Sequence, residues 1–107
     1  FMTFPYDRKT GITHYIIDSE DKAGRMELHE NDYITVQGEI VYKDKYSYIL
    51  QLQYPICFEG RQESELTIPR TSDYSLYSIS EKKTITGQLE QGAPRSSNGG
   101  NLMIKPL

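Results

Sequence analysis

The sequence predicts a single all-β domain, a small and strongly curled barrel with at most one short helix. Its 107 residues hold two alanines, against nine tyrosines, eight threonines and eleven isoleucines. Alanine is the best helix former, whereas Tyr, Thr and Ile suit the half-buried surface of a sheet. Leu, Ile, Val and Phe number 24 together, which permits a small core and disfavours a large enzyme cleft. The length suits one domain over residues 1–107.

The clearest strand pattern begins at Tyr33. One face of the expected strand carries Ile34, Val36, Gly38 and Ile40, and the intervening residues are polar. A polar turn at residues 43–45 precedes a second alternating run. One face of that run carries Tyr46, Tyr48, Leu50, Leu52 and Tyr54. Two strands around a three-residue turn predict an antiparallel hairpin, and Pro55 bends or ends its second strand.

The rest of the chain divides into short strands and polar connections. Further strands are expected at 12–17, 66–68, 83–90 and 102–105. We expect polar turns, loops or irregular stretches at 1–11, 18–25, 26–32, 58–65 and 91–101. Residues 73–79 show three-residue spacing, which predicts a single helical turn capped by Ser72 or Asp73.

Two segments share a pattern that places a glycine inside a strand. Residues 35–40 and 84–89 both read Thr, apolar, polar, Gly, polar, apolar. A glycine inside a strand weakens it unless the strand bends sharply or another backbone approaches closely. Gly38 and Gly87 are therefore expected at tight bends in two strands of one barrel, although chance could also produce so loose a pattern.

This order of elements resembles the OB-fold, a five-stranded Greek-key barrel in which strands like 36–40 are common. Residues 34–58 and 84–104 are also similar to a family of small exported bacterial proteins, defined only as a domain of unknown function. The similarity lies in a glycine-containing strand, an "Ile-Leu-x-Leu-x-x-Pro-Ile-Cys" type of segment and a later Gly-Leu strand. That resemblance implies no activity, but it implies a periplasmic or secreted location.

Charge and motifs exclude several classes of function. The net charge is −3, and neither half has the basic excess that drives phosphate binding, so nucleic acid is an unlikely partner. No apolar run is long enough to span a bilayer. Nucleophile elbows, phosphate loops and dinucleotide fingerprints are absent, so we expect neither enzyme activity nor a cofactor. His14 and His29 lack partners at metal-ligand spacing, which predicts no metal site.

Cys57 is the one cysteine, so the chain forms no internal disulfide and its redox compartment is undetermined. Its neighbours are Ile56 and Phe58. We expect Cys57 to be a small buried hydrophobic residue, because a reactive thiol needs a nearby base and an electropositive setting.

Tyrosine is the chemically distinctive residue type. Tyrosines provide large contact areas at low entropic cost, although they are also ordinary strand residues. Those at the turn, Tyr42 and Tyr46, are the binding candidates, together with Arg95 in the Gly/Ser-rich loop. The turn at 43–45 and the loop at 91–101 correspond to the two loops that flank the binding face of an OB-fold.

We therefore expect a non-enzymatic binding module that contacts a protein or envelope component. Inhibitor and immunity proteins are modules of this size, and an acidic charge can match a basic target. The alternative is an OB-fold that binds single-stranded nucleic acid by stacking bases on tyrosines. A structural subunit of a larger protein is a third possibility. The surface charge around the turn between Tyr42 and Tyr46 separates the first two.

Overall fold

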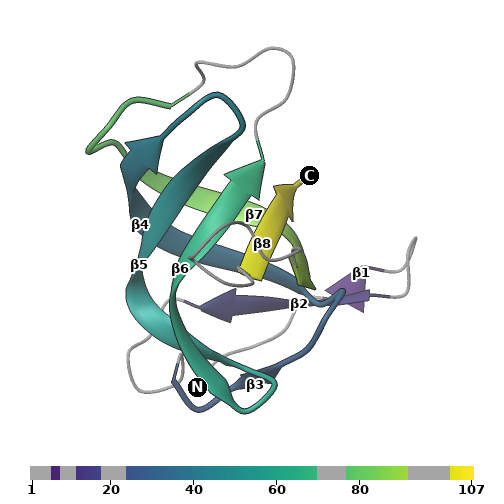
Figure 1. Cartoon of the computed structure of the whole chain (residues 1–107). Helices are drawn as coiled ribbons and strands as arrows, with labels where there is room; N and C mark the ends of the chain where they lie inside the picture. Colours follow the sequence, from purple (N-terminus) through teal and green to yellow (C-terminus); the bar gives the residue numbers. More distant parts are fainter. Residues whose placement is uncertain (1–5, 8–11, 18–23, 70–76, 92–101) are drawn as a thin grey trace.

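The described part of the chain forms eight strands in a computed structural model (Figure 1). The structure describes residues 6–7, 12–17, 24–69, 77–91 and 102–107. The strands are β1 (Tyr6–Asp7), β2 (Ile12–Ile17), β3 (Glu27–Leu28), β4 (Tyr33–Lys43), β5 (Ser47–Phe58), β6 (Arg61–Pro69), β7 (Lys82–Gln91) and β8 (Leu102–Pro106). The described residues include no helix, and none of these segments could span a bilayer as a helix.

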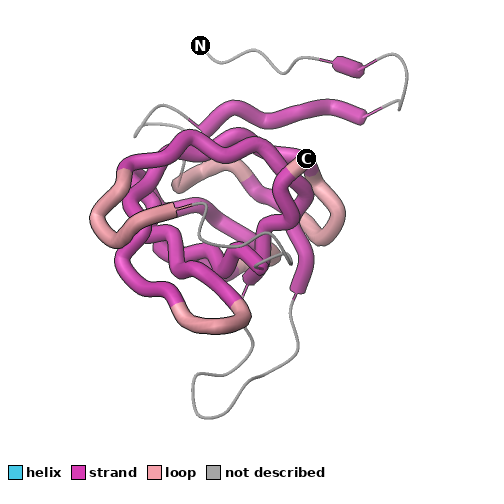
Figure 2. Tube along the Cα trace, turned by 90° about the horizontal axis from the view of Figure 1, so that it is seen from above, coloured by secondary structure: helices cyan, strands magenta, loops and turns pink. Residues whose placement is uncertain are grey.

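Five strands close into a barrel. Their order around it is β4, β5, β6, β8 and β7, and β7 returns to pair with β4. All neighbours are antiparallel except β6 and β8, which run parallel. Seen from above, the strands form a ring, and the N-terminal strands lie outside it (Figure 2). The expected all-β, OB-like Greek-key barrel is confirmed.

Three further strands pair with strands of the barrel or with each other. β2 pairs in parallel with the first half of β4, from His14 opposite Tyr33 to Ile17 opposite Val36. β1 pairs with β2, so Tyr6–Asp7 is a short strand within a stretch expected to be irregular. β3 pairs in parallel with the end of β5, and Leu28 there is fully buried. The interpretation of 26–32 as a solvated connection is therefore wrong at Glu27–Leu28, because a single apolar residue anchors this strand.

The core fills the barrel with side chains from alternate strand positions. Its members include Ile34, Val36, Ile40, Tyr48, Leu50, Leu52, Ile56, Phe58, Leu66, Ile68, Ile85, Leu89, Leu102 and Ile104. The described part of the chain has no buried polar or charged side chain. The period-2 pattern thus marked the inward positions of β4, β5 and β7 correctly, because burial on one face is what maintains that alternation.

The two strand glycines lie where neighbouring backbones come close. A Cβ on Gly38 would lie 2.9 Å from Cγ of Leu50 and 3.0 Å from the carbonyl carbon of Gln51. One on Gly87 would lie 2.8 Å from the carbonyl carbon of Lys105. The two repeated segments pair with each other, with Thr35 opposite Thr86. Both glycines thus lie in one barrel, as expected, at positions where another backbone approaches closely. That both mark tight bends stays a prediction.

The expected loop at 58–65 is wrong, because β5 and β6 are joined directly. Glu59 and Gly60 have φ values of 48° and 81°, and Phe58 pairs with Arg61 across this two-residue turn. Positive φ at both turn positions matches the right-handed twist of hairpin strands. The first half of β6, residues 61–65, has no buried side chain and is polar on both faces, so its sequence shows no alternation of apolar and polar residues. The expected helical turn lies largely outside the described residues.

Candidate functional site

The hairpin between β4 and β5 is held by a carboxylate in its turn. Oδ1 of Asp44 accepts hydrogen bonds from the backbone amides of Tyr46 (2.7 Å) and Ser47 (2.8 Å). The Asp44 amide donates to the carbonyl of Ser47 at 2.9 Å. Side-chain acceptance of this kind is the usual reason for Asp at the start of a turn. These hydrogen bonds fix the backbone conformation of the turn that carries Lys45 and Tyr46.

A β-bulge at Val41 turns the side chain of Tyr42 outward. Ile40 pairs with Leu50, but Tyr42 pairs with Ile49, so β4 holds one extra residue between these pairs. Bulges of this kind redirect the side chains that follow them. Tyr42 is 53% exposed and Tyr46 is 62% exposed. The two tyrosines expected to bind therefore both reach the surface at the same end of the barrel.

A turn before β7 brings a further apolar side chain to this end. The amide of Ser80 donates to the carbonyl of Ile40 at 2.6 Å, and the amide of Ile40 donates to the carbonyl of Glu81 at 2.9 Å. Oε1 of Glu81 accepts from the amide of Ser78 at 2.7 Å, which closes the turn. Ile79 is thus placed beside the end of β4, and half of its surface is exposed.

These residues form what we call the hairpin-end patch, which comprises Val41, Tyr42, Tyr46 and Ile79. They are four of the five large hydrophobic residues that the described chain exposes, the fifth being Leu107. Contiguous exposed apolar groups on a small protein mark interaction sites more often than scattered ones do. Sequence reasoning missed Val41 and Ile79, because no sequence signal marked the bulge or the turn.

Two tyrosine rings and two lysines pack together at the same end of the barrel. The buried ring of Tyr48 meets the ring of Tyr77 edge to face, with centroids 4.9 Å apart. Nζ of Lys83 lies over the same Tyr77 ring, 4.9 Å from its centroid, and also pairs with Glu81 at 3.7 Å. Nζ of Lys43 donates to the Tyr77 carbonyl at 3.4 Å. The side chains around Tyr77 are thus well packed at the end of the barrel that carries the patch.

Arg95 and nearly all of the second expected binding loop lie outside the described residues. Of the stretch 91–101, the structure describes only Gln91, the last residue of β7. The structure therefore brings Tyr42 and Tyr46 together, and Arg95 as a third contact residue stays a prediction.

A shallow polar depression of about 520 Å³ lies on the outer side of the barrel beside Gly38. It is lined by outward residues of β4, β5 and β7, among them Gln37, Glu39, Gln51, Gln53, Lys82 and Thr84. Nε2 of Gln37 donates to Oγ1 of Thr84 at 3.3 Å. Carboxamides and a hydroxyl can form hydrogen bonds with a ligand, but the depression contains no nucleophile with an adjacent base.

Cys57 is half-buried and points away from the core, so the expectation that it is a buried hydrophobic residue is wrong. Its neighbours Ile56 and Phe58 take the inward positions of β5, which leaves Cys57 on the outer face. The thiol donates to Oε1 of Glu27 at 3.1 Å, and this bond raises the pKa of Cys57. The same bond, with one from the amide of Gly60 at 2.8 Å, lowers the pKa of Glu27.

The described residues contain no group of three or more His, Cys, Asp and Glu side chains that could hold a metal ion. The comparisons with known proteins add no relative. Neither a protein-family model, nor a curated protein, nor a solved structure matches this chain.

Proposed function

We propose that this chain is a non-enzymatic binding module that contacts a protein through the hairpin-end patch. The observation that carries the proposal is the gathering of Val41, Tyr42, Tyr46 and Ile79 on one supported end of the barrel. Tyrosines are enriched among the residues that dominate protein interfaces, and aliphatic neighbours exclude water around them. The resemblance to exported bacterial proteins supports a periplasmic or secreted location, and the small size of the domain supports an inhibitor or immunity type of role.

Binding of single-stranded nucleic acid is the alternative, and the charge of the barrel wall argues against it. The wall formed by β5 and β6 is the usual binding face of an OB-fold. Gln51 and Glu65 pair across its middle, and Ile49 pairs with Thr67. A strand of nucleic acid needs a positive groove with aromatic rings along its path. The described outward residues along the middle of this wall supply neither cations nor exposed rings.

Binding measurements on variants of the patch test the proposal. The wild-type chain is used to isolate a partner from an envelope extract, and the purified partner is then titrated with Tyr42→Ala, Tyr46→Ala and Arg95→Ala. We expect each variant to weaken binding by about 1–3 kcal/mol, because Tyr and Arg dominate interface energies. The melting temperature should stay nearly unchanged for the two exposed tyrosines.

Leu107→Ala is the matched control, because Leu107 is an exposed apolar residue outside the patch. It should bind the partner as the wild type does. Unaltered affinity in Tyr42→Ala and Tyr46→Ala would remove this surface from consideration, and unaltered affinity in Arg95→Ala would remove the predicted third contact. Tight binding of a single-stranded oligonucleotide, lost in the tyrosine variants, would favour the alternative function.

A further inference from the structure

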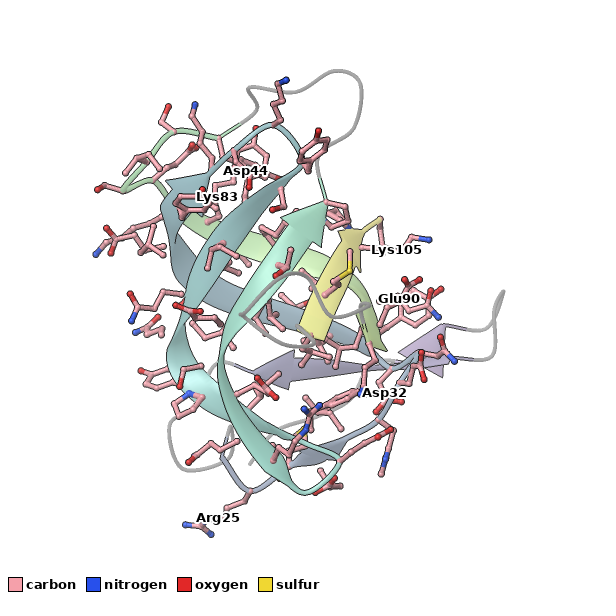
Figure 3. The ribbon with its side chains drawn as sticks, viewed as in Figure 1. Arg25, Asp32, Asp44, Lys83, Glu90 and Lys105 are labelled. Atoms are coloured by element: carbon pink, nitrogen blue, oxygen red, sulfur yellow. The ribbon has the colours of Figure 1, made fainter. Side chains whose placement is uncertain are left out.

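The ends of the barrel differ in charge. Lysines surround the hairpin-end patch, namely Lys43, Lys45, Lys82 and Lys83. The first three are exposed, and Lys43 and Lys45 flank Asp44 in the turn. Figure 3 shows Asp44 and Lys83 at this end of the molecule and Arg25 at the opposite end.

Three carboxylates lie among these lysines, and two of them are engaged with groups of the protein. Oδ1 of Asp44 accepts from two backbone amides in the turn. Glu81 binds the amide of Ser78 and pairs with Lys83. Glu39 lies opposite Lys82 in the register of β4 and β7. Among the residues that the structure describes at this end, four ammonium groups thus exceed three carboxylates, although the whole chain has a net charge of −3.

Acidic side chains gather at the other end, where β5 turns into β6 and β4 begins. They are Glu27, Glu30, Asp32, Glu59 and Glu63. The amide of Glu30 donates to Oε2 of Glu59, and Glu27 accepts from the amide of Gly60, so these residues are neighbours. The acidic net charge and the exposed tyrosines therefore belong to opposite ends. A single contact at the patch cannot use that acidic charge to attract a basic target.

We propose that the hairpin-end patch binds an acidic protein surface, one that presents carboxylates around an apolar side chain. This inference rests on the proposed function and specifies its partner. The apolar residues Val41 and Ile79 fit an apolar side chain, and Lys45 and Lys82 fit the carboxylates around it. Complementary charge of this kind guides association and discriminates against partners of the wrong sign.

An anionic phosphate backbone would meet the same lysines, but the other observations favour a protein. Tyr42 and Tyr46 present rings that suit base stacking, but their neighbours Val41 and Ile79 are aliphatic. The adjoining wall of β5 and β6 contributes glutamines and glutamates. Four of the five described lysines lie at one end, and the fifth, Lys105, is paired with Glu90, so they do not form a continuous path along the barrel. Nucleic-acid binding depends on neutralising a series of phosphates.

Short synthetic peptides test this inference. The probes are a Glu-Glu-Leu repeat, a Lys-Lys-Leu repeat of the same length and single-stranded oligo(dT). Binding is followed by fluorescence anisotropy, and amide chemical shifts locate the contact. We expect the acidic peptide to bind best, to shift amides at 41–46 and 78–83, and to weaken with added salt.

Charge reversal provides the decisive comparison. Lys45→Glu combined with Lys82→Glu should lower the affinity for the acidic peptide by about tenfold or more and raise the affinity for the Lys-Lys-Leu peptide. The neutral pair Lys45→Gln and Lys82→Gln should give a smaller loss. Arg25→Glu changes the charge by the same amount per residue at the opposite end and should leave both affinities unchanged. Unchanged melting temperatures confirm that the variants are folded.

The outcomes separate this inference from the function on which it rests. If the Lys-Lys-Leu peptide binds the patch as well as the acidic one, or if no peptide shifts its amides, the acidic-partner inference is overturned. If oligo(dT) binds the same amides more tightly than either peptide, a protein partner at this site is overturned as well. If Tyr42→Ala and Tyr46→Ala leave partner binding intact, the proposed function fails irrespective of charge.

Discussion

Tyr42 lies opposite Ile49, whereas regular pairing beyond Ile40 and Leu50 would place it opposite Tyr48. Tyr48 is buried inside the barrel, and Ile49 lies on the outer face. The one-residue shift at Val41 therefore decides whether Tyr42 enters the core or reaches solvent. A shift of register by one residue moves side chains to the opposite face, because side chains alternate along a strand.

Deletion of Val41 tests this relationship. We expect regular pairing of β4 with β5 to extend to the turn in the register already present, with Ile40 opposite Leu50 and Tyr42 opposite Ile49. Tyr42 should therefore stay at the surface, and only Val41 leaves the hairpin-end patch. Val41→Ala keeps the chain length and the bulge, and it serves as the control. A buried Tyr42 in the deletion variant, seen by its solvent accessibility in NMR, would contradict the account of the bulge.

Gly38 tests the close approach of β4 and β5. Gly38→Val should destabilise the protein by about 1–3 kcal/mol, because the added carbons meet the backbone of Gln51 and the side chain of Leu50. Thermal and urea unfolding measure the change. Gly24→Ala is the matched control, since a Cβ there would meet Nε2 of Gln62 at 3.4 Å, an ordinary contact. Equal stability of the two variants would show that β4 does not need a glycine at its bend.

Leu28 tests whether β3 is part of the folded structure. The residue is fully buried, and its carbonyl accepts from the amide of Glu59 at 3.0 Å. Leu28→Ala should cost about 2–5 kcal/mol in unfolding free energy, because it removes core contacts and leaves a cavity. Met26→Ala, at a partly buried position nearby, should cost less. If Leu28→Ala lowers the unfolding free energy by less than Met26→Ala does, Leu28 is not a core residue and β3 is not part of the folded structure.

The bond between Cys57 and Glu27 predicts the pH dependence of thiol labelling. Because Glu27 accepts the thiol proton, the pKa of Cys57 is raised, and the native thiol should react slowly with iodoacetamide near neutral pH. Glu27→Ala should move the midpoint of the rate profile to lower pH. Glu30→Ala removes a nearby carboxylate that does not contact Cys57 and should leave the midpoint in place. Rapid labelling of the native wild-type protein would contradict this role.

The same bond links stability to pH in two opposite ways. A raised pKa for Cys57 in the folded state gives stability that is present below the unfolded pKa and lost as pH rises through the raised value. A lowered pKa for Glu27 gives stability that is present above its usual value and lost as pH falls through the lowered value. Denaturation curves of the wild type and Cys57→Ala should therefore diverge most between the two pKa values and least at strongly acidic and strongly alkaline pH.

Alternating apolar residues and mid-strand glycines determined much of the fold by themselves. The inward positions of β4, β5 and β7 follow from a period of two, and Gly38 and Gly87 marked the close approaches that curl the barrel. Tyr42 and Tyr46 stood out because large apolar rings beside a polar turn rarely find room inside. These are local signals, since each depends on neighbours along the chain.

Tertiary structure alone decided where the strands end, how they pair and which surface they build. Leu28 is buried only because β3 meets the end of β5, and Cys57 faces outward only because Ile56 and Phe58 fill the interior. Val41 lies beside Tyr42 at the surface because of a bulge that depends on pairing with another strand. Ile79 lies at the same end because its neighbours Ser80 and Glu81 form backbone hydrogen bonds with Ile40. Strand direction also places Lys43 and Lys83 at one end and Glu27, Glu30 and Glu59 at the other, because the closed barrel brings residues distant in sequence to the same end.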